Sequence, residues 1–239
     1  MKKIDVCLSP DLIHLFDLRG KIVVVVDILR ATSCMTTGLA HGINSIKPFA
    51  SLDECRKMKE AGYFVAGERN GQKLDDFDLG NSPFDYMEKE FHGKNIAVTT
   101  TNGTVAIEKS ADAAQIVIGA FLNISAVANY LREKDQDVII LCAGWKGKVN
   151  LEASLFAGAL IEKLQNDFSN ACDAPLLSQI AYQAISDNLM AMVQTSSHAK
   201  RLQKLNIHDD IAFCLKMDEY AVVPVLHKGE IVRLSELMV

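Results

Sequence analysis

The 239-residue sequence lacks any stretch rich in proline, glycine and serine, and it has no low-complexity run and no obvious internal repeat. Flexible connections between domains have such compositions, so their absence disfavours a multidomain chain. Hydrophobic residues make up 49% of the sequence, which is enough to bury a sizeable core. We therefore predict a single domain over residues 1–239.

Long apolar runs and dense basic stretches are also absent. The apolar run at residues 22–26 is far shorter than the roughly 20 residues that a membrane-spanning helix needs. The N-terminal stretch MKKIDVCLSPD reaches a polar residue too soon for a signal peptide. The net charge is −5, and lysine and arginine do not cluster into a nucleic-acid surface. We expect neither a membrane nor a nucleic acid as a partner.

Cysteine is present but never in a spacing that suits a metal. None of the six cysteines forms a CxxC pair, which disfavours a zinc site. Most of them lie inside apolar segments and behave there as small hydrophobic residues. A reducing cytoplasm is the simplest setting for such a chain. The sequence leaves open whether the chain forms a homo-oligomer.

The best-known phosphate-handling signatures are missing as well. There is no GxxxxGK[ST] loop and no GxGxxG turn. Leu29 stands two residues after Asp27, so the DxD pair of haloacid-dehalogenase phosphatases is absent. No cysteine has an arginine six positions later, and no Arg-His-Gly triplet occurs. Any phosphate chemistry must therefore use a different set of residues.

What the sequence does contain is a regular alternation of short β-branched runs with longer helical stretches. This alternation predicts an α/β fold with a mostly parallel sheet covered by helices on both faces. Residues 175–215 are predicted to be entirely helical, and 220–234 to form a hairpin that turns at Lys228-Gly229 and adds antiparallel strands at an edge. The predicted strands are 21–27, 45–50, 63–68, 93–100, 114–120 and 137–144, and the helices between them are 31–42, 52–62, 103–111, 123–134 and 150–165.

Four of these strands end in polar loops. Ligands bind beyond the carboxyl ends of strands in open α/β sheets, so parallel strands would bring the four loops to one crevice. The residues that the loops supply are Asp27 and Arg30; Glu68 and Arg69; Thr100, Thr101, Asn102, Gly103 and Thr104; and Lys146 and Lys148.

The segment TTTNGT at 99–104 admits two interpretations. A hydroxyl-rich turn that leads into a helix N-terminus can bind phosphate through free backbone N–H groups and the helix dipole. The same residues also suit an ordinary helix cap formed by Asn102 or Thr104.

The charged residues are equally open when each is taken alone. Asp27 suits either a cap or catalysis, and Glu68 with Arg69 suits either a solvated ion pair or a binding site. His198, Arg201 and Lys204 share helical spacing, which fits a solvated basic face or a clamp over an anion. Carboxylates without clustered histidine or cysteine suit a hard cation such as Mg²⁺, which commonly bridges carboxylates to a phosphate.

Six motifs occur in the order of a known family: VVDILRATS, GERNG, FDLGNSP, TTTNGT, AGWKG and SSHAKRL. Over nearly the whole chain the sequence resembles the 2-phosphosulfolactate phosphatase (ComB) family. The resemblance implies a three-layer α/β/α fold and a Mg²⁺-dependent acid phosphatase, a phosphoric monoester hydrolase. The family reaction converts 2-phospho-3-sulfolactate to 3-sulfolactate and phosphate in coenzyme M biosynthesis.

The resemblance also implies site residues. We expect a catalytic group of Asp27, Arg30, Glu68 and Arg69, and Mg²⁺ held by Asp27, Glu68 and Glu152. The chain departs from the family pattern at Ala153, where an aspartate would follow Glu152; if that aspartate contacts the metal, this chain has lost a ligand. The alternative function is then a non-catalytic binder or sensor of phosphorylated metabolites. The expected substrate-binding residues are Thr100, Thr101, Asn102, Gly103, Thr104, Asn81, Lys146, His198 and Arg201.

Overall fold

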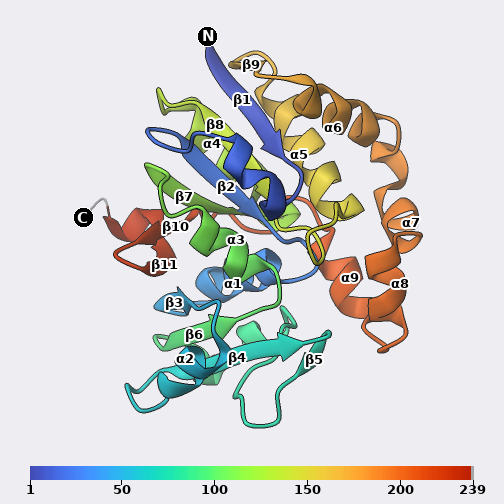
Figure 1. Cartoon of the computed structure of the whole chain (residues 1–239). Helices are drawn as coiled ribbons and strands as arrows, with labels where there is room; N and C mark the ends of the chain where they lie inside the picture. The colour runs from blue at the N-terminus through green and yellow to red at the C-terminus, as the bar shows by residue number, and fades with distance from the viewer. Residues whose placement is uncertain (238–239) are drawn as a thin grey trace.

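The computed structural model describes residues 1–237 of the chain (Figure 1). Within them one eleven-stranded sheet has the order β5-β4-β6-β3-β11-β10-β7-β2-β8-β1-β9. The strands are β1 (Lys2–Cys7), β2 (Ile22–Val26), β3 (Ser45–Pro48), β4 (Phe64–Arg69), β5 (Gln72–Lys73), β6 (Asn95–Thr99), β7 (Gln115–Gly119), β8 (Val138–Cys142), β9 (Phe168–Asn170), β10 (Pro224–His227) and β11 (Glu230–Arg233). The α-helices are α1 (Ala31–Ala40), α2 (Leu52–Lys57), α3 (Gly103–Lys109), α4 (Ile124–Arg132), α5 (Leu151–Leu164), α6 (Asp173–Gln183), α7 (Leu189–Gln194), α8 (Ser197–Gln203) and α9 (His208–Cys214).

The molecule has three layers, with the sheet in the middle and helices on both of its faces, as the sequence predicts. Along β2, Val24 and Val26 pack into a cluster with residues of α4 and α5 on one face. Val23 and Val25 pack into a second cluster with residues of α1 and α3 on the other face. Every residue of β2 is buried because both faces of the strand are covered. The α/β/α class and the mostly parallel mixed sheet are therefore confirmed.

The C-terminal hairpin lies in the middle of the sheet, so its predicted place at an edge is wrong. Strand β10 pairs antiparallel with β7, and β11 pairs antiparallel with β3. Val225 and Ile231, at these two junctions, are fully buried. The apolar side chains of the hairpin thus join two parallel blocks, one of β4, β6 and β3 and the other of β7, β2, β8, β1 and β9.

Three strands, β1, β5 and β9, were not anticipated from the sequence. Strand β1 is interrupted by Lys3 and Asp5, so it does not show a continuous apolar run. Strand β9 has only three residues and occupies the edge beside β1. The edges of the sheet are therefore β9 and the short β5.

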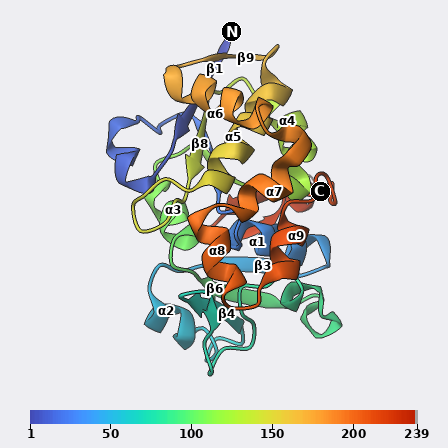
Figure 2. The ribbon, with the colours of Figure 1, turned by 90° about the vertical axis from the view of Figure 1, so that its right-hand side faces the viewer.

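Residues 175–215 are helical, as predicted, and run from α6 to α9 with short breaks. Figures 1 and 2 show α8 and α9 beside α1, on the side toward which the β4 arrow points. This places α8 next to the loops that follow β2 and β4. Within residues 1–237 no helix is long and apolar enough to cross a membrane.

Candidate active site

A small polar pocket collects residues from all four of the predicted strand-end loops. The space between its lining residues, which is partly open to solvent, has a volume of about 280 Å³. Helix α8 closes one side, and the loop that carries Asn81 supplies another wall. The strands that deliver these loops belong to both parallel blocks, so the loops converge even though the sheet is interrupted by the hairpin. The lining residues are Asp27, Leu29, Arg30, Glu68, Gly71, Asn81, Asn102, Trp145, His198, Arg201 and Leu202.

Asp27 follows β2 directly and is only 4% exposed. Burial is the main reason why the pKa of its carboxyl rises to about 7, and the charges of Glu68 and Glu152 raise it further. His198 and a hydrogen bond from the backbone N–H of Gly103 act in the opposite direction. A methyl group on Gly103 would lie 2.9 Å from Oδ2 of Asp27, so glycine permits this close approach. The carboxyl of Asp27 therefore lies against the start of α3.

The remaining residues of 99–104 hold the turn and its neighbours. The backbone N–H of Thr100 donates to Oγ1 of Thr104 over 3.3 Å, and the N–H of Thr104 donates to Oγ1 of Thr100 over 3.1 Å. Thr101 donates to Oε1 of Glu68 through its N–H and its hydroxyl, over 3.0 and 2.8 Å. Asn102 lines the pocket and accepts the N–H of Lys146 over 3.3 Å. The predicted cap by Asn102 is absent, because its side chain makes no capping hydrogen bond; Thr100 accepts the N–H of Thr104 instead, and Asn102 lines the pocket.

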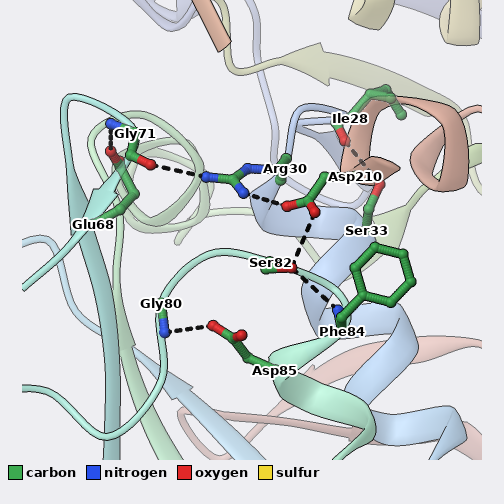
Figure 3. Close-up of polar contacts among 10 residues, drawn as sticks. All are labelled: Ile28, Arg30, Ser33, Glu68, Gly71, Gly80, Ser82, Phe84, Asp85 and Asp210. Carbon is green, nitrogen blue, oxygen red and sulfur yellow. Dashed lines mark hydrogen bonds and ion pairs between the residues drawn. The ribbon is translucent and has the colours of Figure 1, made fainter. Parts of the chain in front are cut away.

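Glu68 is buried and held by its own loop. Its Oε2 accepts the N–H of Gly71 over 2.6 Å (Figure 3), while Oε1 is held by Thr101. Arg69 does not pair with this carboxylate: its Nη1 donates to the carbonyl oxygen of Glu68 over 2.7 Å and its Nη2 to Oγ1 of Thr99 over 3.3 Å. Arg69 is not among the residues that line the pocket. Glu68 and Arg69 therefore do not form the side-chain ion pair that the sequence suggested. Arg69 also lies outside the pocket lining, where a catalytic residue was expected.

Arg30 is buried at the pocket wall and joins three segments (Figure 3). Its Nη1 forms an ion pair with Asp210 in α9, and its Nη2 donates to the carbonyl oxygen of Gly71 over 3.1 Å. Asp210 in turn accepts the hydroxyl of Ser82 over 3.1 Å. Sequence reasoning missed Asp210, because the predicted helical region carried no sign that one of its acids faces Arg30. The arginine is thereby fixed, and part of its charge is neutralised.

Helix α8 contributes His198 and Arg201 to the pocket. His198 stacks on Trp145, with ring centroids 5.7 Å apart and planes 24° apart. The guanidinium of Arg201 lies 3.5 Å from the centroid of the same indole. Burial lowers the pKa of Arg201. Lys204 and Lys146 are exposed and do not line the pocket.

Two buried polar atoms at the pocket have no hydrogen-bond partner within the described residues: Nη1 of Arg201, a donor, and Oδ1 of Asn81, an acceptor. Unpartnered buried groups are costly, so both suit a polar occupant. Arg201 can donate to an anion, and Asn81 can accept from a hydrated or protonated group.

The three expected metal ligands do not converge. Glu152 is fully buried, lies outside the pocket lining and binds Nδ1 of His198 over 2.5 Å. Within residues 1–237 no group of three His, Cys, Asp or Glu side chains is arranged to hold a metal. Asp27 and Glu68 remain at the pocket, and the charge of Glu68 contributes to the raised pKa of Asp27. One or two carboxylates are enough for a Mg²⁺ that completes its shell with water and phosphate.

Ala153 has no exposed surface and belongs to the apolar cluster between the sheet and α5. It is not part of the pocket lining. The position that raised the question of a lost ligand therefore lies in the hydrophobic core.

Comparison with known proteins agrees with the geometry. A family model described as 2-phosphosulpholactate phosphatase matches residues 7–229. A protein of Caldanaerobacter subterraneus subsp. tengcongensis named "Probable 2-phosphosulfolactate phosphatase" is 41% identical over 92% of this chain and 93% of its own length. Proteins with the same name from Thermotoga maritima and Clostridium acetobutylicum are 40% and 36% identical, over 86% and 96% of this chain and 89% and 99% of their own lengths. This chain belongs to the 2-phosphosulfolactate phosphatase family.

Proposed function

We propose that the chain is a Mg²⁺-dependent phosphatase that hydrolyses 2-phospho-3-sulfolactate, or a similar small phosphorylated organic acid, to 3-sulfolactate and phosphate. The observation that carries the proposal is the meeting of Asp27, Glu68, His198 and Arg201 in one small pocket of a chain from this family. The name of the family supports this substrate. A cytoplasmic role in coenzyme M biosynthesis belongs to the same proposal.

The cations of the pocket suit a compact polyanion. Phosphate, carboxylate and sulfonate give such a substrate several negative charges, while the whole chain carries −5. The chain must therefore gather positive charge locally. Arg201 has a free buried N–H to donate, and Trp145 keeps its guanidinium flat against the pocket wall. Charge-assisted hydrogen bonds from arginine to phosphate are stronger than neutral ones.

Asp27 and Glu68 are the residues that would hold Mg²⁺. When bound there, the cation would supply positive charge against the phosphate oxygens. Glu68 is preset for this role, because Thr101 and Gly71 fix both of its oxygens. Asp27 is preset by the rigid end of β2 and by the N–H of Gly103.

Proton transfer is the second task of the site. Groups with a pKa near the working pH are the most effective acids and bases. Burial raises the pKa of Asp27 to about 7 in the metal-free protein. A bound Mg²⁺ would favour the ionised carboxylate, so proton transfer falls to His198. His198 lines the same pocket and presents the ring nitrogen that Glu152 does not occupy.

A panel of phosphate esters, assayed with Mg²⁺ and with a chelator, tests this proposal. We expect Mg²⁺-dependent release of phosphate, fastest with small esters that carry a second acidic group. Tight binding of such esters without any turnover would instead support the binder or sensor. The burial of Ala153 in the core gives that alternative no support from a missing ligand.

A further inference from the structure

Glu152 is a buried acidic residue to which the proposed chemistry gives no role. Its side chain is fully buried in the first turn of α5, beside the apolar residues Ala153 and Leu155. A carboxylate in such a place costs several kcal/mol unless a partner compensates for its lost hydration. The partner is Nδ1 of His198, 2.5 Å from Oε1, while Oε2 has no partner within the described residues. One imidazole therefore provides the hydrogen bond that this buried carboxylate makes.

We propose that Glu152 is a positioning residue that fixes the tautomer and the orientation of His198, so that Nε2 is the nitrogen left to exchange a proton with the substrate; Nε2 donates to a phosphate oxygen once it carries a proton. The substrate part of this inference rests on the proposed function. An ionised carboxylate can only accept a hydrogen bond, so Nδ1 must carry a proton when it binds Glu152. The nitrogen left for the pocket is then Nε2. A histidine without such a partner can adopt either tautomer.

The same contact sets the place of α8. His198 and Arg201 are three residues apart and thus share one face of the helix. The imidazole of His198 and the guanidinium of Arg201 both contact Trp145, which follows β8. His198 stacks on the indole, and the guanidinium carbon of Arg201 lies 3.5 Å from the ring centroid. Glu152 holds the first member of this stack from the core side. Glu152 therefore acts on the pocket through His198 while it lies outside the pocket itself.

A purely structural salt bridge between α5 and α8 would give the same contact, so stability alone cannot identify the role. The tautomer of His198 is a direct readout. We expect ¹⁵N-detected NMR of the full chain at pH 8 to show a proton on Nδ1 of His198, with the signal assigned by its loss in His198→Gln. An Nε2–H tautomer with bare Nδ1 in the wild-type protein would overturn the inference, and this measurement requires no altered Glu152.

The variant Glu152→Gln keeps the size of the side chain and removes its charge. Because an amide can donate as well as accept, we expect a mixture of His198 tautomers and a kcat lower by about 10–100-fold, by analogy with the loss of the carboxylate behind a metal-bound histidine. Glu162→Gln, in the same helix but partly exposed, is the matched control and should leave both unchanged. Unchanged kcat and tautomer in Glu152→Gln would contradict the inference.

Binding of inorganic phosphate, measured by calorimetry, separates this inference from the proposed function. We expect weaker phosphate binding in Glu152→Gln than in Glu162→Gln. If the wild-type chain hydrolyses no ester, the proposed function fails, while the tautomer and the phosphate affinity still decide the role of Glu152. Equal phosphate affinity in both variants, together with a wild-type tautomer, would leave Glu152 a structural residue only.

Discussion

Asp27 combines the energetic cost of a buried carboxyl with a proposed functional role. The strand before it is fully covered, so its carboxylate has little water to hydrate it. Burial and the neighbouring carboxylates raise its pKa to about 7 from the ordinary 3.8. The buried, ionised carboxylate of Asp27 therefore lowers the free energy of unfolding of the metal-free protein. This cost keeps an acid at the place where a cation and a phosphate are expected.

The pH dependence of stability follows from this shift. Because the folded pKa lies above the unfolded one, the folded state is favoured by protonation, and stability falls as pH rises from about 4 through 7. In chelator-treated protein, Asp27→Asn should therefore raise the melting temperature relative to wild type more at pH 8 than at pH 4. The corresponding change in the free energy of unfolding should amount to a few kcal/mol, at roughly 1.4 kcal/mol per pKa unit. Parallel melting curves for the two proteins across this range would contradict the raised pKa; exposed Asp135→Asn is the control.

Arg201 and Arg69 provide a second test at the same scale. Arg201→Ala should lower kcat/KM, with a loss of about 1.5–3 kcal/mol of transition-state stabilisation, the usual range for a hydrogen bond to a charged group. Arg69→Ala should have a much smaller effect, since Arg69 binds the backbone of Glu68 and the hydroxyl of Thr99 outside the pocket. Steady-state kinetics on the same ester measures both. A large loss for Arg69→Ala with none for Arg201→Ala would return the anion contact to the position expected from the sequence.

At the scale of elements, one buried ion pair ties the pocket walls together. Arg30, in the loop between β2 and α1, joins Asp210 of α9 and the carbonyl oxygen of Gly71. The exposed fractions of the two charged side chains are 5% and 11%. Removing one partner of such a pair leaves an uncompensated buried charge, which is strongly destabilising.

Asp210→Ala should therefore lower the free energy of unfolding by about 3–5 kcal/mol. Ser82→Ala removes only the hydroxyl that Asp210 accepts and should cost about 1 kcal/mol. Urea unfolding followed by circular dichroism measures both. If the two variants lose the same small amount, the pair does not hold α9 against the loops.

The elements themselves were largely predictable, because continuous apolar runs and helical spacing are local signals. Strand β1 was not predicted because Lys3 and Asp5 break its pattern, and β5 and β9 were not predicted because they are so short. The strand-end loops were predictable for the same reason, since polar residues follow apolar strands. The contacts of Asp210, Glu152 and Trp145 were not, because each depends on which segments the fold brings together.

At the scale of the whole molecule, the hairpin of β10 and β11 joins the two parallel blocks of the sheet. Sequence pattern gives the hairpin but not its neighbours, since strand order is set by packing over long sequence separations. Val225 pairs with Val117 of β7, and Ile231 with Ile46 of β3. The last strands of the described chain are thus central to the sheet that positions the pocket.

Val225→Asp should prevent cooperative folding, because an unpaired carboxylate in the middle of the sheet costs several kcal/mol. His227→Asp, at the exposed end of the same strand, is the matched control and should fold normally. Thermal melting and near-ultraviolet circular dichroism report the outcome. Normal folding of Val225→Asp would be expected of an edge hairpin and would contradict the central position.

The central claim is that the pocket at Asp27 carries out phosphate ester hydrolysis, and the activity of Asp27→Asn tests it most directly. The measurement is Mg²⁺-dependent phosphate release by the folded variant, compared with wild type on the same ester. We predict a loss of at least about 100-fold, or roughly 2.7 kcal/mol in the barrier, with the fold retained. Since asparagine caps a helix nearly as well as aspartate, a mere cap would leave the rate unchanged. Full activity in Asp27→Asn would contradict the account.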